Sequence, residues 1–539
     1  MNKMGKGTLR NSAALSIFSG ILLAVSFPRW EFSLLAFVSL IPLLFACKDK
    51  TPRASFLLGG ITGMVYFVGT LSWVTISMEM YGGLSKIISV PLMLLLSAYL
   101  SLYVALFACL LRFSGDNLLL GAAPIFWTAL EYLRGHLLTG FPWNTLGYSQ
   151  YRNLSLIQIA DITSVYGVSF IIVFINASLY LIARTAWKEK TVARRPAILL
   201  VVVLVGTFLY GNYRLSDPMG NGKTIRAAVI QGNIDQGMKW SPNMREEIIE
   251  KYERLSRPFS NRADLVIWPE AAFPAFFQNE PLYQERLGRL VQDGQFSLLF
   301  GSPAFLETDS GQVSLLNSAY LLSGGNGSSP AQQSDFTTSN GSRLSAGGTA
   351  SRYDKMHLVP FGEYVPFKSL LFFVDKMVTG IGDFIPGETA TVLEMPARSG
   401  RSARSGRSAK IGTAICFEVI FPNEVRRFAQ NGANLMVTIT NDAWFGDSAA
   451  PNQHFSMVVF RAIENRMAFS RAANTGISGF IDAHGKILQT GSLFKEAVLL
   501  ETLSLGFQKT IYTRYGDFFA IGNLLLMLGL IGWAILKRR

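Results

Sequence analysis

Apolar residues are unevenly distributed along this chain of 539 residues, because they dominate positions 1–213 and 517–539 while the stretch between mixes apolar and charged positions. A helix that crosses a bilayer needs about 20 mostly apolar residues. The apolar runs predict eight such helices, near residues 12–28, 32–47, 56–79, 87–111, 118–134, 162–183, 197–213 and 517–536. Basic residues precede the first run, as in a signal peptide, but seven further runs favour an integral membrane protein. We therefore expect a membrane domain with seven spans over 1–213, a domain outside the membrane over 214–516, and an eighth span with a short tail over 517–539.

Clusters of lysine and arginine indicate the orientation of these helices, because such residues are retained on the cytoplasmic side. They flank the predicted spans at Lys3, Lys6, Arg10, Lys48, Lys50, Arg53, Arg112, Arg184, Lys188, Lys190, Arg194, Arg195, Lys537, Arg538 and Arg539. With eight spans these clusters all fall on one side, so both termini are expected in the cytoplasm and residues 214–516 on the opposite side. The net charge of +13 is thus interpreted first as a topology signal, and nucleic-acid binding is a poor second interpretation.

Several runs within 214–516 have the length and apolar character of buried strands, with amphipathic segments between them. The predicted strands are 225–234, 265–273, 296–305, 410–421 and 434–446. Apolar positions at helical spacing predict helices over 244–257, 282–294 and 452–473. Strands that alternate with helices are typical of a layered α/β domain.

Three stretches of this domain lie outside the alternating pattern. Residues 324–348 are rich in Gly and Ser and predict a flexible surface loop, whereas residues 397–409 repeat Arg and Ser and predict a basic, solvated hairpin extension. The apolar, glycine-interrupted segment 370–388 is compatible with a mobile lid that dips into the lipid interface, or with a buried helix and turn of the domain.

Three residues able to perform chemistry lie at or near strand ends. Glu270 follows an apolar run in VIWPEAAF, Lys355 lies in the polar loop SRYDKMHLVP, and Cys416 ends the run IGTAIC. Taken singly, each has an ordinary explanation: a solvated turn carboxylate, a surface lysine and a small buried hydrophobe. A disulfide is not expected, because Cys47 and Cys109 lie in predicted spans. The spacings of cysteine and histidine match no zinc motif, so no metal site is expected.

Taken together, the three side chains complete one mechanism. A thiol becomes a good nucleophile when it loses its proton, and a carboxylate in an apolar setting can accept that proton. An ammonium or a backbone N–H can then hold the oxyanion of a tetrahedral intermediate. The competing arrangement is a Cys–His pair in which His357 or His454 is the base. The residues alone leave both arrangements open.

Four motifs follow one another along the domain: WPE at 268–270, KMHLVPFGE at 355–363, CFE at 416–418 and NDAWFG at 441–446. In this order they resemble the carbon–nitrogen hydrolase (nitrilase) superfamily, whose domains are α-β-β-α sandwiches with a Glu-Lys-Cys triad. Eight spans, with such a domain before the last, narrow the resemblance to the apolipoprotein N-acyltransferase family of the bacterial inner membrane. The resemblance covers essentially the whole chain. It implies a polytopic α-helical membrane domain joined to an α/β nitrilase-like sandwich on the periplasmic side.

The resemblance implies a role for each residue of the triad, with Glu270 as general base, Lys355 as oxyanion stabiliser and Cys416 as the acylated nucleophile. In that family a ping-pong reaction moves the sn-1 acyl chain of a phospholipid, typically phosphatidylethanolamine, onto the cysteine as a thioester. The α-amine of a diacylglyceryl-cysteine apolipoprotein then takes the acyl group as an amide, which is the last step of lipoprotein maturation. No metal or other cofactor is implied.

The same resemblance assigns six further residues to substrate positioning and support of the site: Trp240, Glu363, Tyr364, Phe417, Glu418 and Trp444. Position 417 is Phe where some members of the family have Tyr, so this chain has no hydroxyl group at that position.

Two other functions compete with acyl transfer. A membrane-tethered nitrilase-like amidase would not need lipid access or eight spans, and a transporter with a binding domain would need more ionisable residues within its spans than this chain has.

Overall fold

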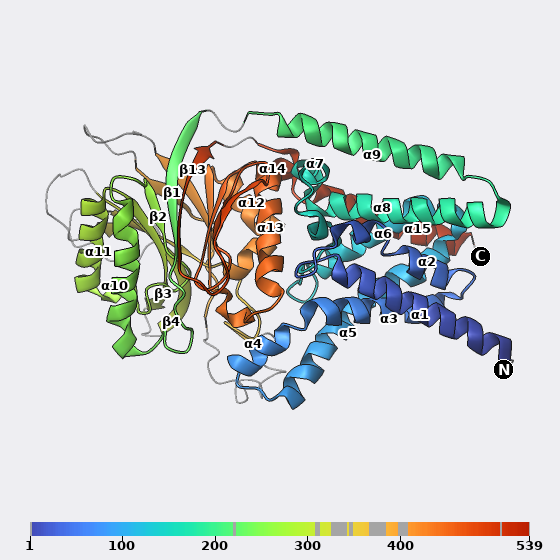
Figure 1. The fold of residues 1–539 in the computed structure, drawn as a ribbon, viewed down its shortest axis with the longest axis horizontal. Coiled ribbons are helices and arrows are strands. Elements are labelled where there is room, and N and C mark those ends of the chain that lie inside the picture. The colour runs from blue at the N-terminus through green and yellow to red at the C-terminus, as the bar shows by residue number, and fades with distance from the viewer. Residues whose placement is uncertain are drawn as a thin grey trace. The chain divides into compact units, whose positions relative to one another are not determined.

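The computed structural model describes residues 3–218, 222–307, 313–324, 342–343, 349–365, 384–396, 408–506 and 509–537, which fold as two units (Figure 1). The helical unit comprises Met1–Asp217, Ser448–Phe460 and Tyr515–Arg539, and the α/β unit comprises Pro218–Asp447 and Arg461–Arg514. Helix α13 (Ala450–Asn465) lies within the range predicted for the external domain and is divided between the two units. Most of the loop predicted over 324–348, of the extension over 397–409 and of the segment 370–388 lies outside the described residues.

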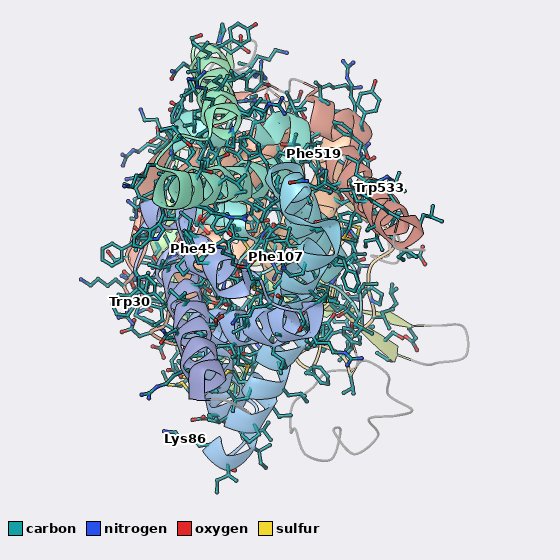
Figure 2. All side chains as sticks on the ribbon, turned by 90° about the vertical axis from the view of Figure 1, so that its right-hand side faces the viewer. Trp30, Phe45, Lys86, Phe107, Phe519 and Trp533 are labelled. Carbon is teal, nitrogen blue, oxygen red and sulfur yellow. The ribbon has the colours of Figure 1, made fainter. Side chains whose placement is uncertain are left out.

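Apolar runs form most helices of the helical unit. These helices are α1 (Lys3–Val25), α2 (Ile41–Cys47), α3 (Pro52–Leu71), α4 (Val74–Met80), α5 (Lys86–Ser114), α6 (Leu119–Arg134), α7 (Leu154–Ile157), α8 (Ala160–Glu189), α9 (Arg194–Leu215) and α15 (Phe518–Leu536). Among the described residues, five helices are long and apolar enough to cross a membrane: α3, α5, α8, α9 and α15. Arg10–Val25 and Ser33–Cys47 are shorter apolar segments. In Figure 2 the exposed Trp30 and Trp533 lie at the periphery, whereas Phe107 is buried among the helices.

Small residues allow α3 and α5 to pack closely. A Cβ added at Gly59 would lie 2.6 Å from the carbonyl oxygen of Val104, and one added at Gly63 would lie 2.8 Å from the Cα of Ser101. Both distances are too short for a side chain, so only glycine permits this approach. Small residues at such contacts are typical of membrane helices, whose association depends on close packing more than on the hydrophobic effect.

Two sheets form the centre of the α/β unit. The seven-stranded sheet has the order β13-β1-β2-β3-β4-β6-β5, with β1 (Lys223–Gln231), β2 (Leu265–Ile267), β3 (Ser297–Glu307), β4 (Val313–Ser323), β5 (Ser342–Arg343), β6 (Thr349–Asp354) and β13 (Ala497–Leu505). The six-stranded sheet has the order β12-β11-β10-β9-β8-β7, with β7 (Val392–Met395), β8 (Ala409–Ile415), β9 (Leu435–Thr440), β10 (Phe469–Ala473), β11 (Gly479–Ile481) and β12 (Ile487–Thr490). Strands β1–β2–β3 and β8–β9–β10 run parallel, so their carboxyl ends meet at common edges.

Helices cover each sheet. Helices α10 (Arg245–Ser256) and α11 (Pro281–Gly294) bury apolar side chains in one core with β1, β3 and β4 of the seven-stranded sheet. Helix α12 (Pro422–Gln430) packs on β8, where a Cβ added at Gly412 would meet Phe428 at 2.7 Å. The short α14 (Ile511–Tyr515) follows β13. The predicted α/β domain is therefore confirmed.

Hydrogen bonds join the two sheets at the ends of β1 and β10. The side chain of Asn474, just after β10, accepts from the N–H of Ile234 at 2.9 Å and donates to its carbonyl at 2.8 Å. The helix predicted over 452–473 is wrong in its second half, because α13 ends at Asn465 and residues 469–473 form β10. All five residues of β10 are buried between β9 and β11, so pairing in the sheet overrides the helical spacing.

Candidate active site

The three residues of the predicted triad all belong to the α/β unit, and each follows a strand. Glu270 lies in the turn after β2, Lys355 immediately follows β6, and Cys416 immediately follows β8. Strands β2 and β6 belong to the seven-stranded sheet and β8 to the other, so the site forms between the two sheets. Both Glu270 and Lys355 contribute electrostatically to the pKa of Cys416, which places the three groups near one another.

Hydrogen bonds fix the carboxylate of Glu270 from both sheets. Its Oε1 accepts from Nδ2 of Asn317 at 2.8 Å, and its Oε2 accepts from the backbone N–H of Asn441 at 2.9 Å. Asn317 belongs to β4, whereas Asn441 follows β9 of the six-stranded sheet. Nζ of Lys355 lies 3.9 Å from Oε1 of Glu270. The two oxygens of the candidate base are thus held in fixed positions beside the candidate cation.

Lys355 is 1% exposed, and it is neutralised by a second carboxylate. Its Nζ lies 2.9 Å from Glu363, whose Oε1 also accepts from Nδ2 of Asn317 at 2.8 Å. Burial alone would lower the pKa of Lys355, but the negative charges of Glu363 and then Glu270 outweigh this effect and raise the pKa above its ordinary value. The lysine is therefore an ammonium at neutral pH and can stabilise a developing oxyanion.

Cys416 lies in a sharp turn between β8 and a short 3-10 helix (Cys416–Ile420). Its φ of 52° is in the left-handed region, which costs a residue with a Cβ about 1–2 kcal/mol, so the surrounding structure must hold it there. The residue is 8% exposed. Burial, and then the charge of Glu270, raise the pKa of the Cys416 thiol, while Lys355 opposes this effect. The resting thiol is therefore protonated at neutral pH and needs a base to become a nucleophile.

Glu418 connects the segment of Cys416 with the segment of Lys355. One carboxylate oxygen accepts from the N–H of Ile415 at 2.6 Å, and the other accepts from the hydroxyl of Tyr353 at 2.6 Å and the N–H of Met356 at 2.6 Å. Burial raises the pKa of Glu418 to about 7 even though these donors oppose it. This fully buried side chain therefore ties the end of β8 to the loop after β6.

Lys239 is a further buried cation at the site that the sequence reasoning missed. Its Nζ donates to the backbone carbonyl of Glu270 at 3.0 Å, and burial lowers the pKa of Lys239 to about 8. Asn317 was missed as well. It lies in the apolar run LLNSAYLL, where a polar residue in a buried strand is the signal that could have identified it.

The remaining predicted residues lie around this centre with different exposure. Trp240 and Trp444 are 52% and 40% exposed, so they can contact a substrate rather than support a core. Tyr364 is half-buried, and its carbonyl accepts from the N–H of Phe361 in the turn that carries Glu363. The ring of Phe417 packs edge-on against Phe421, with centroids 5.2 Å apart.

The two histidines considered as alternative bases have other environments. His357 stacks on Phe421 with ring centroids 3.8 Å apart, and burial together with Lys355 lowers its pKa to about 4. His454 belongs to the helical unit, where it is buried and stacks on Trp143. The geometry therefore favours Glu270 as the base for Cys416.

Comparisons with known proteins agree across both units. Residues 19–178 match the model of the apolipoprotein N-acyltransferase N-terminal domain, and residues 226–510 match that of the carbon–nitrogen hydrolase family. A protein of Geobacter metallireducens named apolipoprotein N-acyltransferase is 45% identical over 95% of this chain and 93% of its own. One of the same name from Haemophilus influenzae is 33% identical over 95% and 93%. An amidase structure from Nesterenkonia sp. AN1, with 17% identity and a TM-score of 0.35 over 57% of this chain and 99% of its own, is too distant to carry an argument. On the relatives and the two family matches, the chain belongs to the apolipoprotein N-acyltransferase family.

Proposed function

We propose that this protein transfers the sn-1 acyl chain of a phospholipid, through a thioester on Cys416, to the N-terminal amine of diacylglyceryl-cysteine apolipoproteins. Phosphatidylethanolamine is the proposed donor. The observation that carries the proposal is the position of the buried thiol of Cys416 beside a fixed carboxylate and a buried ammonium. Membership of the family supports the choice of lipid substrates.

In the first half-reaction, Glu270 takes the proton of the Cys416 thiol while the sulfur attacks the ester carbonyl. The ammonium of Lys355 stabilises the oxyanion that forms. When the tetrahedral intermediate collapses, the bond to the glycerol oxygen breaks and Glu270 returns its proton to that oxygen. The products are a lysophospholipid and an acyl thioester on Cys416.

In the second half-reaction, the α-amine of the apolipoprotein attacks the thioester carbonyl. Glu270 accepts a proton from the amine, and the oxyanion again lies against Lys355. Collapse of the intermediate breaks the carbon–sulfur bond, releases the amide and returns the proton to Cys416. One base and one cation therefore serve both steps of a ping-pong reaction.

The architecture proposed for this reaction is an eight-span membrane domain with an α-β-β-α sandwich inserted before the last span. Two sheets with helices packed on them support the sandwich. The five long apolar helices support a polytopic protein, and the basic clusters support an orientation with the termini in the cytoplasm and the α/β unit in the periplasm. The inner membrane is the compartment that follows from this orientation.

The test uses full-length protein in detergent with phosphatidylethanolamine labelled in its sn-1 chain. We expect a labelled, hydroxylamine-sensitive adduct that is lost in Cys416→Ala and kept in the control Cys109→Ala, because Cys109 lies on α5 of the helical unit. Addition of a diacylglyceryl-cysteine peptide should move the label to its amine. An enzyme that forms no adduct with phospholipid but hydrolyses small amides would replace this proposal with the amidase alternative.

A further inference from the structure

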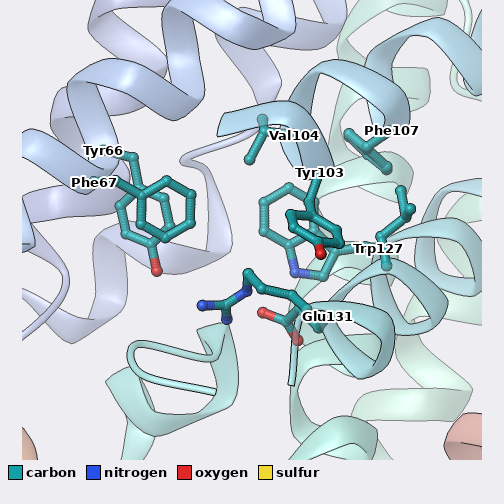
Figure 3. Close-up of a pocket in the computed structure, with 9 residues that line it drawn as sticks. Tyr66, Phe67, Tyr103, Val104, Phe107, Trp127 and Glu131 are labelled. Carbon is teal, nitrogen blue, oxygen red and sulfur yellow. The ribbon is translucent and has the colours of Figure 1, made fainter. Parts of the chain in front are cut away.

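A pocket of the helical unit between α3, α5 and α6 is lined by polar groups that already have partners (Figure 3). Glu131 accepts from a backbone N–H at 2.7 Å and interacts with the side chains of Ser169 and Trp127. The guanidinium of Arg134 lies over the ring of Phe67, 5.5 Å from its centre. These groups satisfy one another, so packing within the helical unit accounts for this pocket.

The active site, in contrast, contains a hydroxyl group beside the reacting sulfur that the proposed half-reactions do not use. Strands β8 and β9 pair in parallel, and their last pair is Ile415 with Ile439. The residues that come next, Cys416 and Thr440, are therefore neighbours. The side chain of Thr440 forms a hydrogen bond with the Cys416 thiol. Thr440 is fully buried, and its carbonyl accepts from the N–H of Asn474 at 3.1 Å, which fixes the end of β9.

Asp442 receives the hydroxyl proton of Thr440 in the resting protein. Oγ1 of Thr440 donates to Oδ1 of Asp442 at 2.9 Å, and Oδ2 of Asp442 accepts from Nη2 of Arg471 at 2.8 Å. The side chains of Asp442 and Arg471 are both completely buried. A Cβ added at Gly476 would lie 2.1 Å from Oδ2 of Asp442, so the backbone there lies close against the carboxylate. A fixed carboxylate thus holds the hydroxyl group next to the sulfur.

The hydroxyl group has one proton to donate, so Asp442 and the sulfur compete for it. While Cys416 is a thiol, the carboxylate is the stronger acceptor. When Glu270 takes the thiol proton, the sulfur gains a negative charge, whereas the charge of Asp442 is already balanced by Arg471. We propose that Thr440 then turns its hydroxyl proton to the sulfur and stabilises it in both half-reactions, an inference that rests on the proposed function.

The hydrogen bond acts when the sulfur carries charge. In the first half-reaction, Thr440 donates to the sulfur as Glu270 removes its proton and the carbon–sulfur bond forms. In the second, that bond breaks and its electron pair returns to the sulfur. The sulfur then accepts the hydrogen bond of Thr440 until Glu270 delivers the proton taken from the amine. Thr440 itself transfers no proton, and because its hydrogen bond is stronger to the charged sulfur than to the neutral one, it lowers the barrier rather than increasing the affinity for lipid.

The test measures alkylation of Cys416 by iodoacetamide in the full-length protein, read from the mass of the peptide that contains this residue. Iodoacetamide is neutral and has no lipid chain, so the rate reports the reactivity of the sulfur rather than the binding of either substrate. Thr440→Val should be alkylated about tenfold more slowly than the wild type, or slower still, as expected for loss of a hydrogen bond to a charged group. Thr440→Ser, which keeps the hydroxyl group, should stay within threefold of the wild type.

Thr438→Val is the matched control. Thr438 is also fully buried on β9, and its hydroxyl group makes no hydrogen bond with the residues that the structure describes. This variant should be alkylated at the wild-type rate. Single-turnover acylation by labelled phospholipid should rank the variants in the same order, with half-saturation at an unchanged lipid concentration.

Two outcomes would overturn the inference. Alkylation of Thr440→Val at the wild-type rate would mean that the sulfur does not depend on the hydroxyl group. An equal loss in Thr440→Val and Thr440→Ser would mean that Thr440 is only a structural partner of Asp442. If thermal unfolding shows that Thr440→Val does not fold, Thr440→Ala is judged by the same two criteria. Absence of a thioester from phospholipid would instead refute the proposed function, and the alkylation rates would still decide this inference.

Discussion

Replacement of Asn317 tests the arrangement of the active site most directly. Its Nδ2 donates to Oε1 of Glu270 and to Oε1 of Glu363, each at 2.8 Å. Its backbone carbonyl accepts from the backbone N–H of Lys355 at 2.9 Å. Asn317→Ala removes the two side-chain hydrogen bonds and keeps the backbone one. A hydrogen bond to a charged group contributes about 1.5–3 kcal/mol, so the pair represents about 3–6 kcal/mol. If the variant loses about 3 kcal/mol of transition-state stabilisation, the lower end of this range, thioester formation slows by about 100-fold or more.

The measurement is single-turnover acylation of Cys416 at saturating labelled phospholipid. Asn317→Asp should be slower still, because a third carboxylate would face Glu270 and Glu363 where a donor is required. Asn279→Ala is the matched control, since Asn279 is exposed on the same unit. Thermal unfolding of each variant separates a local effect from loss of the fold. An Asn317→Ala protein that is folded and acylates within threefold of the wild-type rate would refute the argument that these hydrogen bonds position the base.

Three further predictions concern groups around the same centre. Lys239→Met should slow acylation by about tenfold at unchanged KM for phospholipid, because the hydrogen bond that holds the carbonyl of Glu270 is lost; a change in KM alone would contradict this role. His357→Phe should acylate within a few-fold of wild type, since a histidine with a pKa of about 4 that stacks on Phe421 does not serve as the base; an inactive, folded variant would favour the Cys–His alternative. The pKa of Glu418 is raised from 4.5 to about 7, so the folded protein retains a proton that the unfolded chain has lost between these values. This contribution of about 3 kcal/mol is fully present below pH 4.5 and is lost as the pH rises through 7. The Tm of the wild type should therefore fall relative to that of Glu418→Gln between pH 5 and pH 8, and parallel curves would contradict the assignment.

The sequence predicted the elements that end at the active site, because local hydrophobic patterns determine where buried strands begin and end. Strands β2 and β8 lie where strands were predicted, but the predicted ranges 265–273 and 410–421 were too long, because β2 ends at Ile267 and β8 at Ile415, before Glu270 and Cys416. The helix over 452–473 was predicted too long, because the residues of β10 have helical spacing but pair on one side with β11, which follows directly, and on the other with β9, which precedes α13 in the chain. The pattern of apolar and polar residues within a segment does not show which other strands that segment will pair with.

Contacts between the sheets were not accessible to sequence reasoning for the same reason. The partners of Glu270 lie 47 and 171 residues away in the chain, at Asn317 and Asn441. Glu418 was assigned to support of the site only by family resemblance, and its function as a tie between two loops depends on the register of β6 and β8. In contrast, Glu270, Lys355 and Cys416 could be proposed as a triad because their three residue types complete one mechanism, and the order of the four motifs, rather than the residues alone, favoured them over a Cys–His pair.

The state of the thiol has a consequence for the fate of the proposed acyl-enzyme. Burial and the charge of Glu270 keep Cys416 protonated, so in the proposed reaction the nucleophile forms only as Glu270 takes its proton, in the same step as the attack on the ester. The thioester must then wait for a second lipid substrate, and water is the competing acceptor. A site in which Cys416 is 8% exposed and the base is fixed by two hydrogen bonds limits the geometries from which water can attack. The thioester should therefore persist without acceptor, and the ratio of amide to free fatty acid when a diacylglyceryl-cysteine peptide is added is the quantity that separates a transferase from a hydrolase.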